Sequence, residues 1–132
     1  MTAYALGSFR DIVPAAPGAG PHPGIIEYVE RIQATLDPFG GRFLVHGAEV
    51  EVLEGDWPGN MVLIGFPGLA EARAWYASPE YQALVPLRTD HVEGVIILVD
   101  GVAPGYDPAQ LAAKMRAANA AGAAGAGGAA GS

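Results

Sequence analysis

The sequence contains no cysteine, and this absence removes several kinds of chemistry at once. Disulfides, thiolate nucleophiles and every zinc site that needs sulfur are excluded. The sequence also lacks an apolar run of the ~18 residues that a bilayer-spanning helix requires, and its first residues lack the basic and apolar regions of a secretory signal. We therefore expect a cytoplasmic protein that does not associate with a membrane.

Positive charge is also scarce. The 132 residues include 7 Lys and Arg against 14 Asp and Glu, and the net charge is −7. The basic side chains are scattered along the sequence, so we expect no face that neutralises several phosphates. The composition argues against binding to nucleic acid and against attraction to an anionic membrane.

Motifs for metals, phosphates and nucleophilic catalysis are missing as well. The three histidines, His22, His46 and His91, occur without the His-x-His or Glu-x-x-His spacing of a metal site. The glycine-rich segment 18–24 contains prolines, which lack the N–H groups of a phosphate cradle. No serine stands in a nucleophile elbow. The sequence therefore predicts no metal ion and no cofactor.

The apolar content is sufficient for one packed domain, because 51% of the residues are hydrophobic and 16% are charged. A bend is expected at residues 47–48 in the second strand, where glycine and alanine interrupt the apolar pattern. Beyond it, alternating glutamates and valines over 49–54 predict a resumed, half-buried strand, followed by a turn. The predicted strands are residues 2–10, 42–54, 61–66 and 91–100.

Two helices are expected between these strands. A loop rich in proline and glycine at 13–24 leads into a helix from about residue 23 to 36, where apolar residues recur at helical spacing. The second helix opens at Pro67-Gly68. It restarts at Ser78, which can act as an N-cap because Pro79 and Glu80 follow it.

The order of these segments is β-α-β-β-α-β, with the second helix split in two. This is the ferredoxin-like arrangement, an α+β fold with a four-stranded antiparallel sheet and both helices on one face. The segments 61–64 and 95–99 are apolar on both faces, so the face without helices also needs a cover. A second copy is the simplest cover, and we expect a homodimer that forms an α+β barrel.

The last part of the chain has a different composition. We predict a domain over residues 1–101 and an extension over 102–132. Asp107-Pro108 can start a short helix over about 108–120. From Gly122 onward the sequence is almost only alanine and glycine, and since each helical glycine costs about 1 kcal/mol, we expect a flexible tail.

Residues 2–101 resemble a bacterial family of small α+β domains, the domain-of-unknown-function family 1330. The residues that carry the resemblance lie at 40–45, 51–57, 66–67, 70–76, 78–81 and 86–88. The resemblance implies a ferredoxin-like dimeric α+β barrel, similar in fold to small-molecule monooxygenases, isomerases, dehalogenases and ligand-binding domains. The chain departs from the family pattern at His46, Ala48 and Gly65, where the family usually has Arg, Gly and Glu.

His46 is the first candidate for chemistry, because an imidazole takes and gives protons near neutral pH. The alternative is that it only replaces a solvated arginine. Arg42 either holds a ligand carboxylate with a bidentate fork or pairs with Glu49 or Glu51 at the surface.

Further candidates for substrate binding lie on the predicted helices and near their ends. Arg88 and His91 either face a ligand or stabilise the end of the split helix, where positive charge is favoured. Trp75, Tyr81 and Tyr28 either belong to the core or line a pocket, which the Tyr28 hydroxyl is long enough to reach.

These observations predict a homodimer that binds a small organic molecule in an apolar pocket. In the catalytic version of this hypothesis, the protein performs acid/base chemistry on that molecule without a cofactor, and His46 is the acid or base. The alternative is a non-catalytic binding or protein-interaction module. An enclosed cavity holding His46 and an arginine favours the first hypothesis, and a barrel filled with side chains favours the second.

Overall fold

The computed structural model describes residues 2–11 and 20–124, which fall into two compact units divided between Val102 and Ala103. The first unit contains a sheet and the helices that cover it. No helix in the described part of the chain combines the length and the apolar character needed to cross a bilayer.

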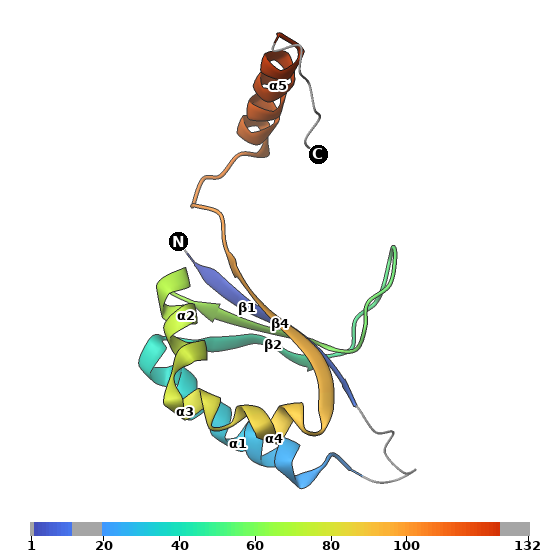
Figure 1. Cartoon of the computed structure of the whole chain (residues 1–132), viewed down its shortest axis with the longest axis vertical. Helices are drawn as coiled ribbons and strands as arrows, with labels where there is room; N and C mark the ends of the chain where they lie inside the picture. Colours follow the sequence, from blue (N-terminus) through green and yellow to red (C-terminus); the bar gives the residue numbers. More distant parts are fainter. Residues whose placement is uncertain (1, 12–19, 125–132) are drawn as a thin grey trace. The chain divides into compact units, whose positions relative to one another are not determined.

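The sheet has four antiparallel strands in the order β2-β3-β1-β4. Figure 1 shows all the helices of the first unit on one side of this sheet. The topology is the ferredoxin-like one and confirms the predicted α+β fold class. The strands are β1 (Ala3–Asp11), β2 (Arg42–Ala48), β3 (Met61–Phe66) and β4 (Val92–Asp100).

The helices of this unit are α1 (Pro23–Leu36), α2 (Leu69–Ala77), α3 (Pro79–Gln82) and α4 (Val85–Thr89), with a 3-10 turn at Asp37–Phe39. The break before α3 has its predicted cap, since the Ser78 hydroxyl accepts a hydrogen bond from the Tyr81 backbone N–H at 3.2 Å. A second break, before α4, was not expected. Pro86 explains it, because proline lacks an N–H and its ring clashes with the carbonyl four residues earlier.

The hydrophobic core lies between the sheet and the helices. Trp75 of α2 is at its centre, with its ring 4.1 Å from that of Tyr81 and 5.5 Å from that of Phe66. Its indole N–H donates to the Thr35 hydroxyl at 3.0 Å, so its one polar atom is satisfied. The largest fully buried side chains are Trp75, Tyr81, Phe66, Leu36 and Leu84.

Strand β2 confirms the predicted bend and corrects the predicted continuation. Gly47 has φ +73°, and the pairing with β3 shifts between His46 and Ala48. The strand then ends at Ala48 and does not resume over 49–54. The alternation of glutamate and valine fits a half-buried strand, but within the described chain residues 49–54 pair with no neighbouring strand.

Residues 49–60, which we call the arm, leave the sheet as a long loop on the side away from the helices (Figure 1). Leu53 is 84% exposed there. The end of the arm is fixed to β1, because the Asn60 N–H donates to the Phe9 carbonyl at 3.1 Å and the Ser8 hydroxyl donates to the Pro58 carbonyl. Only the outer part of the arm is therefore free of the sheet.

The second unit contains α5 (Pro108–Ala124). The Asp107 carboxylate accepts a hydrogen bond from the Ala109 N–H at 2.9 Å, which caps the helix start as expected. The helix extends beyond the predicted end near residue 120 and includes Gly122, because the alanines around this glycine are the strongest helix formers. The rest of the predicted flexible tail, residues 125–132, lies outside the described residues.

Candidate functional site

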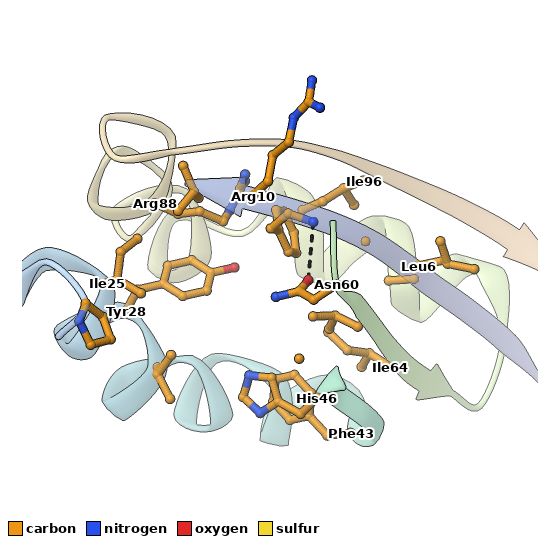
Figure 2. A pocket seen from close by; sticks show the side chains of 18 of the residues that line it. Leu6, Arg10, Ile25, Tyr28, Phe43, His46, Asn60, Ile64, Arg88 and Ile96 are labelled. Atoms are coloured by element: carbon orange, nitrogen blue, oxygen red, sulfur yellow. Dashed lines mark hydrogen bonds between the residues drawn. The ribbon is translucent and has the colours of Figure 1, made fainter. Parts of the chain in front are cut away.

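A cavity of about 440 Å³ lies between the sheet and the helices α1 and α4. Polar side chains border it at Tyr28, His46, Asn60 and Arg88, and Figure 2 shows these four around one shared space. Arg10 also borders the cavity, but its guanidinium points away from this space and pairs with Glu93. This volume is in the usual range for a pocket that takes one small organic molecule. Most of the lining is apolar and comes from Ala5, Phe9, Ile25, Val29, Phe43, Val62, Ile64, Val92 and Ile96.

A bulge in β2 positions His46 in this cavity. Phe43 pairs with Ile64 of β3, but the next paired residue is Val45, so Leu44 is an extra residue in the strand. This insertion shifts the alternation by one, and His46 consequently lies opposite Val62, on the same face as Phe43. The two rings stack with centroids 4.0 Å apart.

The surroundings of His46 favour its neutral form. Partial burial lowers the pKa of His46 below its usual value, since burial penalises the charged imidazolium. Among the described residues, none forms a hydrogen bond with the imidazole. A neutral imidazole offers one nitrogen that accepts and one that donates, both available to a molecule in the cavity.

Asn60 is a residue of the site that the sequence analysis missed, because it was assigned only to a turn. Its side-chain oxygen accepts a hydrogen bond from the Phe9 N–H at 3.3 Å, which orients the amide. Figure 2 shows the amide nitrogen directed towards the space between Tyr28 and His46. It follows that Asn60 can donate to a ligand.

Tyr28 reaches the cavity from α1 and is hydrogen-bonded to a buried partner. Its hydroxyl lies 2.7 Å from the Tyr81 hydroxyl, and the two rings meet edge to face. Burial, together with the neighbouring Tyr81, raises the pKa of Tyr28 well above its usual range. Tyr28 therefore keeps its proton and acts as a hydrogen-bonding group, not as an acid at neutral pH.

Arg88 brings a positive charge to the cavity from α4. The residue is 7% exposed, and its guanidinium carbon lies 5.1 Å from the centre of the Phe9 ring and 5.8 Å from that of Tyr28. Burial alone would lower the pKa of Arg88, but Tyr81 and Tyr28 more than offset it, so the pKa is raised. The Nε–H of Arg88 has no hydrogen-bond acceptor within the described structure.

The Phe9 ring that supports Arg88 occupies space left by two glycines. A Cβ atom at Gly7 of β1 would lie 2.6 Å from the Phe9 ring, and one at Gly94 of β4 would also collide with it. Because neither glycine has a side chain, the ring lies directly over the backbone of the two strands. A side chain at either position would push the ring into the cavity.

Of the other predicted site residues, Trp75 lines the cavity, and the remaining three do not. Arg42 is exposed and pairs with Gly65, on the sheet face opposite the cavity. Tyr81 is fully buried and does not line the cavity itself, but it contacts the lining residues Tyr28 and Trp75. His91 stacks on His22 with ring centroids 3.4 Å apart and is not part of the cavity lining.

The cavity thus combines a neutral imidazole, two hydrogen-bond donors and the buried cation of Arg88 around an apolar interior. Such a site can hold a small, mostly apolar molecule and transfer a proton at the imidazole. Within residues 2–11 and 20–124, no three His, Asp or Glu side chains are placed to hold a metal ion. Phe9 and Phe43 also line the cavity, and the sequence did not predict this. Isolated aromatic residues on strands fit a hydrophobic core equally well.

Comparison with solved structures finds proteins with a similar fold. Methylated RPA0582 is 19% identical, with 80% of this chain and 84% of that chain covered and a TM-score of 0.60. RPA0582 is described as a protein of unknown function from Rhodopseudomonas palustris. SnoaB from Streptomyces nogalater, a cofactor-independent oxygenase, is 14% identical, with 80% of this chain and 98% of that chain covered and a TM-score of 0.50. At these identities the likeness concerns the fold alone.

No curated protein matches the sequence. Residues 21–102 match a protein family described as a domain of unknown function, DUF1330. These residues include every element of the first unit except β1, and they amount to more than half of the chain. The protein therefore belongs to the DUF1330 family.

Proposed function

We propose that this protein binds a small, largely apolar organic molecule in the cavity and carries out acid/base chemistry on it with His46. The observation that carries this proposal is the cavity itself, which is apolar in most of its lining and includes the neutral-leaning imidazole of His46. A base must be unprotonated to accept a proton, and a lowered pKa keeps it so at neutral pH. Asn60 and Tyr28 orient the ligand by hydrogen bonds.

The proposal needs no bound cofactor. SnoaB, which shares the fold, is described as a cofactor-independent oxygenase. That description extends to this chain only as an example of chemistry that the fold can support. The proposed role of His46 is proton transfer. Identifying the bound ligand would identify the reaction.

Native mass spectrometry of protein purified from its own host tests this proposal. We expect a mass excess from a retained small molecule that is lost on denaturation. His46→Ala should lower turnover of that molecule at least about tenfold, in line with the usual contribution of a general base. His91→Ala is the matched control, because this histidine does not line the cavity. Unchanged turnover in His46→Ala would remove the catalytic assignment.

We also propose that the functional form is a homodimer. The sheet face without helices is apolar along β4, where Val95, Ile97 and Val99 are 57%, 50% and 44% exposed. On β2, Leu44 is exposed as well. An exposed apolar surface of this kind is typical of an interface, and two such faces packed together form an α+β barrel. The arm projects from the same face (Figure 1), and its exposed Leu53 is available for contact with a second copy.

A further inference from the structure

Among the side chains that the structure describes, the buried guanidinium of Arg88 has no counter-ion. Ion pairs in the described structure join Arg10 to Glu93 and Arg31 to Glu27, and none includes Arg88. Its Nε–H is buried and has no acceptor in the part of the chain that the structure describes. A charge that leaves water without a partner is costly, so a group of opposite charge that enters the cavity is strongly favoured.

The contacts that Arg88 does make hold it in place without neutralising it. The rings of Phe9 and Tyr28 lie within 5.1 Å and 5.8 Å of its guanidinium carbon, a distance at which a cation and a ring attract each other. Phe9 in turn lies over Gly7 and Gly94. The guanidinium is therefore oriented by the fold before any ligand arrives, and orientation in advance lowers the entropic cost of binding.

Tyr28 adds a hydrogen-bond donor beside this cation. The two hydroxyls of Tyr28 and Tyr81 share one hydrogen bond, so one of their two protons remains for another acceptor. Tyr81 is fully buried, whereas Tyr28 borders the cavity. When Tyr81 donates to Tyr28, the proton of Tyr28 is directed at whatever occupies the cavity.

We infer that Arg88 and Tyr28 form an anion subsite, and that the ligand is an apolar, aromatic-sized monocarboxylate. This inference rests on the proposed binding function of the cavity. A carboxylate accepts hydrogen bonds from a guanidinium and a hydroxyl together. Its apolar body would lie against Phe43, Val62 and Ile64, which line the cavity beside His46. The acid group thus fixes the end of the molecule that His46 does not act on.

Two probes of equal size and different charge test the inference. 2-Naphthoate carries a carboxylate at neutral pH, and 2-naphthamide replaces it with a neutral amide. By calorimetry, the wild type should bind the naphthoate at least about tenfold more tightly than the amide, because a charge-assisted hydrogen bond is the stronger kind. Arg88→Gln should abolish this preference. The matched control Arg73→Gln removes one exposed arginine of α2 and should retain the preference.

The two alternative results for the wild type both overturn the anion subsite. Equal affinity of the wild type for both probes overturns it and leaves the proposed binding of an apolar ligand intact. If the wild type binds neither probe, the subsite is overturned, and the retained ligand seen by native mass spectrometry decides the proposed function separately. The comparison of probes on the wild type needs no variant, so the inference remains falsifiable if Arg88→Gln does not fold.

Discussion

Burial has opposite consequences for two side chains of the cavity. It lowers the pKa of His46, so that the imidazole is neutral at neutral pH and can accept a proton. It raises the pKa of Tyr28, so that the hydroxyl keeps its proton and can donate a hydrogen bond. The cavity therefore combines a proton acceptor at His46 with a hydrogen-bond donor at Tyr28 that does not release its proton.

The lowered pKa of His46 predicts a specific dependence of stability on pH. The unfolded chain binds a proton at His46 near pH 6.5, and the folded chain binds it only at lower pH. Because the unfolded state then holds more protons, the free energy of unfolding should fall as the pH drops below about 6.5.

Urea unfolding of the wild type and of His46→Gln across this pH range isolates the effect, since all other groups are common to both. The wild type should lose stability relative to the variant as the pH falls. Parallel curves would contradict a lowered pKa, and titration of the His46 ring by NMR gives the value directly.

The hydrogen bond between Tyr28 and Tyr81 predicts an asymmetric pair of mutants. Tyr28→Phe leaves the fully buried Tyr81 hydroxyl without this partner, which costs about 1–3 kcal/mol of unfolding free energy. Tyr81→Phe leaves a hydroxyl that still borders the cavity, so its cost should be smaller. The double mutant should lose less than the sum of both, as measured by chemical denaturation. Additive losses would show that the two hydroxyls are not coupled.

Among the elements, β2 marks the limit of what the sequence can predict. Gly47 allowed the bend to be predicted from the sequence, because glycine readily adopts positive φ. The extra residue at Leu44 left no such signal, since a bulge depends on which residues of β3 become its partners. Regular alternation would have placed His46 on the same face as Arg42. The bulge separates the two, which is why only His46 lies at the cavity.

The helices were more predictable than the site. Apolar spacing and the Ser78 cap were enough to define α1 and the break before α3, because both signals are local. The cavity instead depends on contacts between distant segments, such as Asn60 with Phe9 and Arg88 with Phe9. Sequence patterns do not report such pairs, so Arg42 was included and Asn60 was missed.

The start of α1 depends on an unusual cap. The His22 Nδ1 accepts a hydrogen bond from the Gly24 N–H at 2.9 Å, in the place where Ser, Thr, Asp or Asn is usual. His22→Ala should lower the free energy of unfolding by about 0.5–2 kcal/mol, measured in urea. His22→Asp should retain most of this stability, since a carboxylate also accepts a hydrogen bond from the Gly24 N–H and its negative charge is favourable at a helix N-terminus. His91→Ala controls for the lost ring stacking. An equal loss in the aspartate variant would argue against capping.

At the scale of the whole molecule, the two faces of the sheet differ in how they are covered. The helices bury one face, and the cavity lies under them. The other face exposes apolar side chains of β2 and β4, and among the described residues of the first unit no helix covers it. A surface like this is tolerated in water only at a cost in solubility, so a partner that covers it is favoured.

Ile97 tests this assembly because it lies on β4 opposite Leu6, in the middle of the exposed face. Ile97→Lys places a charge where two copies would pack, and burying an unpaired charge is costly enough to break a dimer of this kind. Light scattering after size exclusion should give a dimer for the wild type and a monomer for the variant. Ile26→Lys is the matched control, since Ile26 is similarly exposed but lies on α1, and it should remain dimeric. A monomeric wild type, or a dimeric Ile97→Lys, would exclude packing through this face.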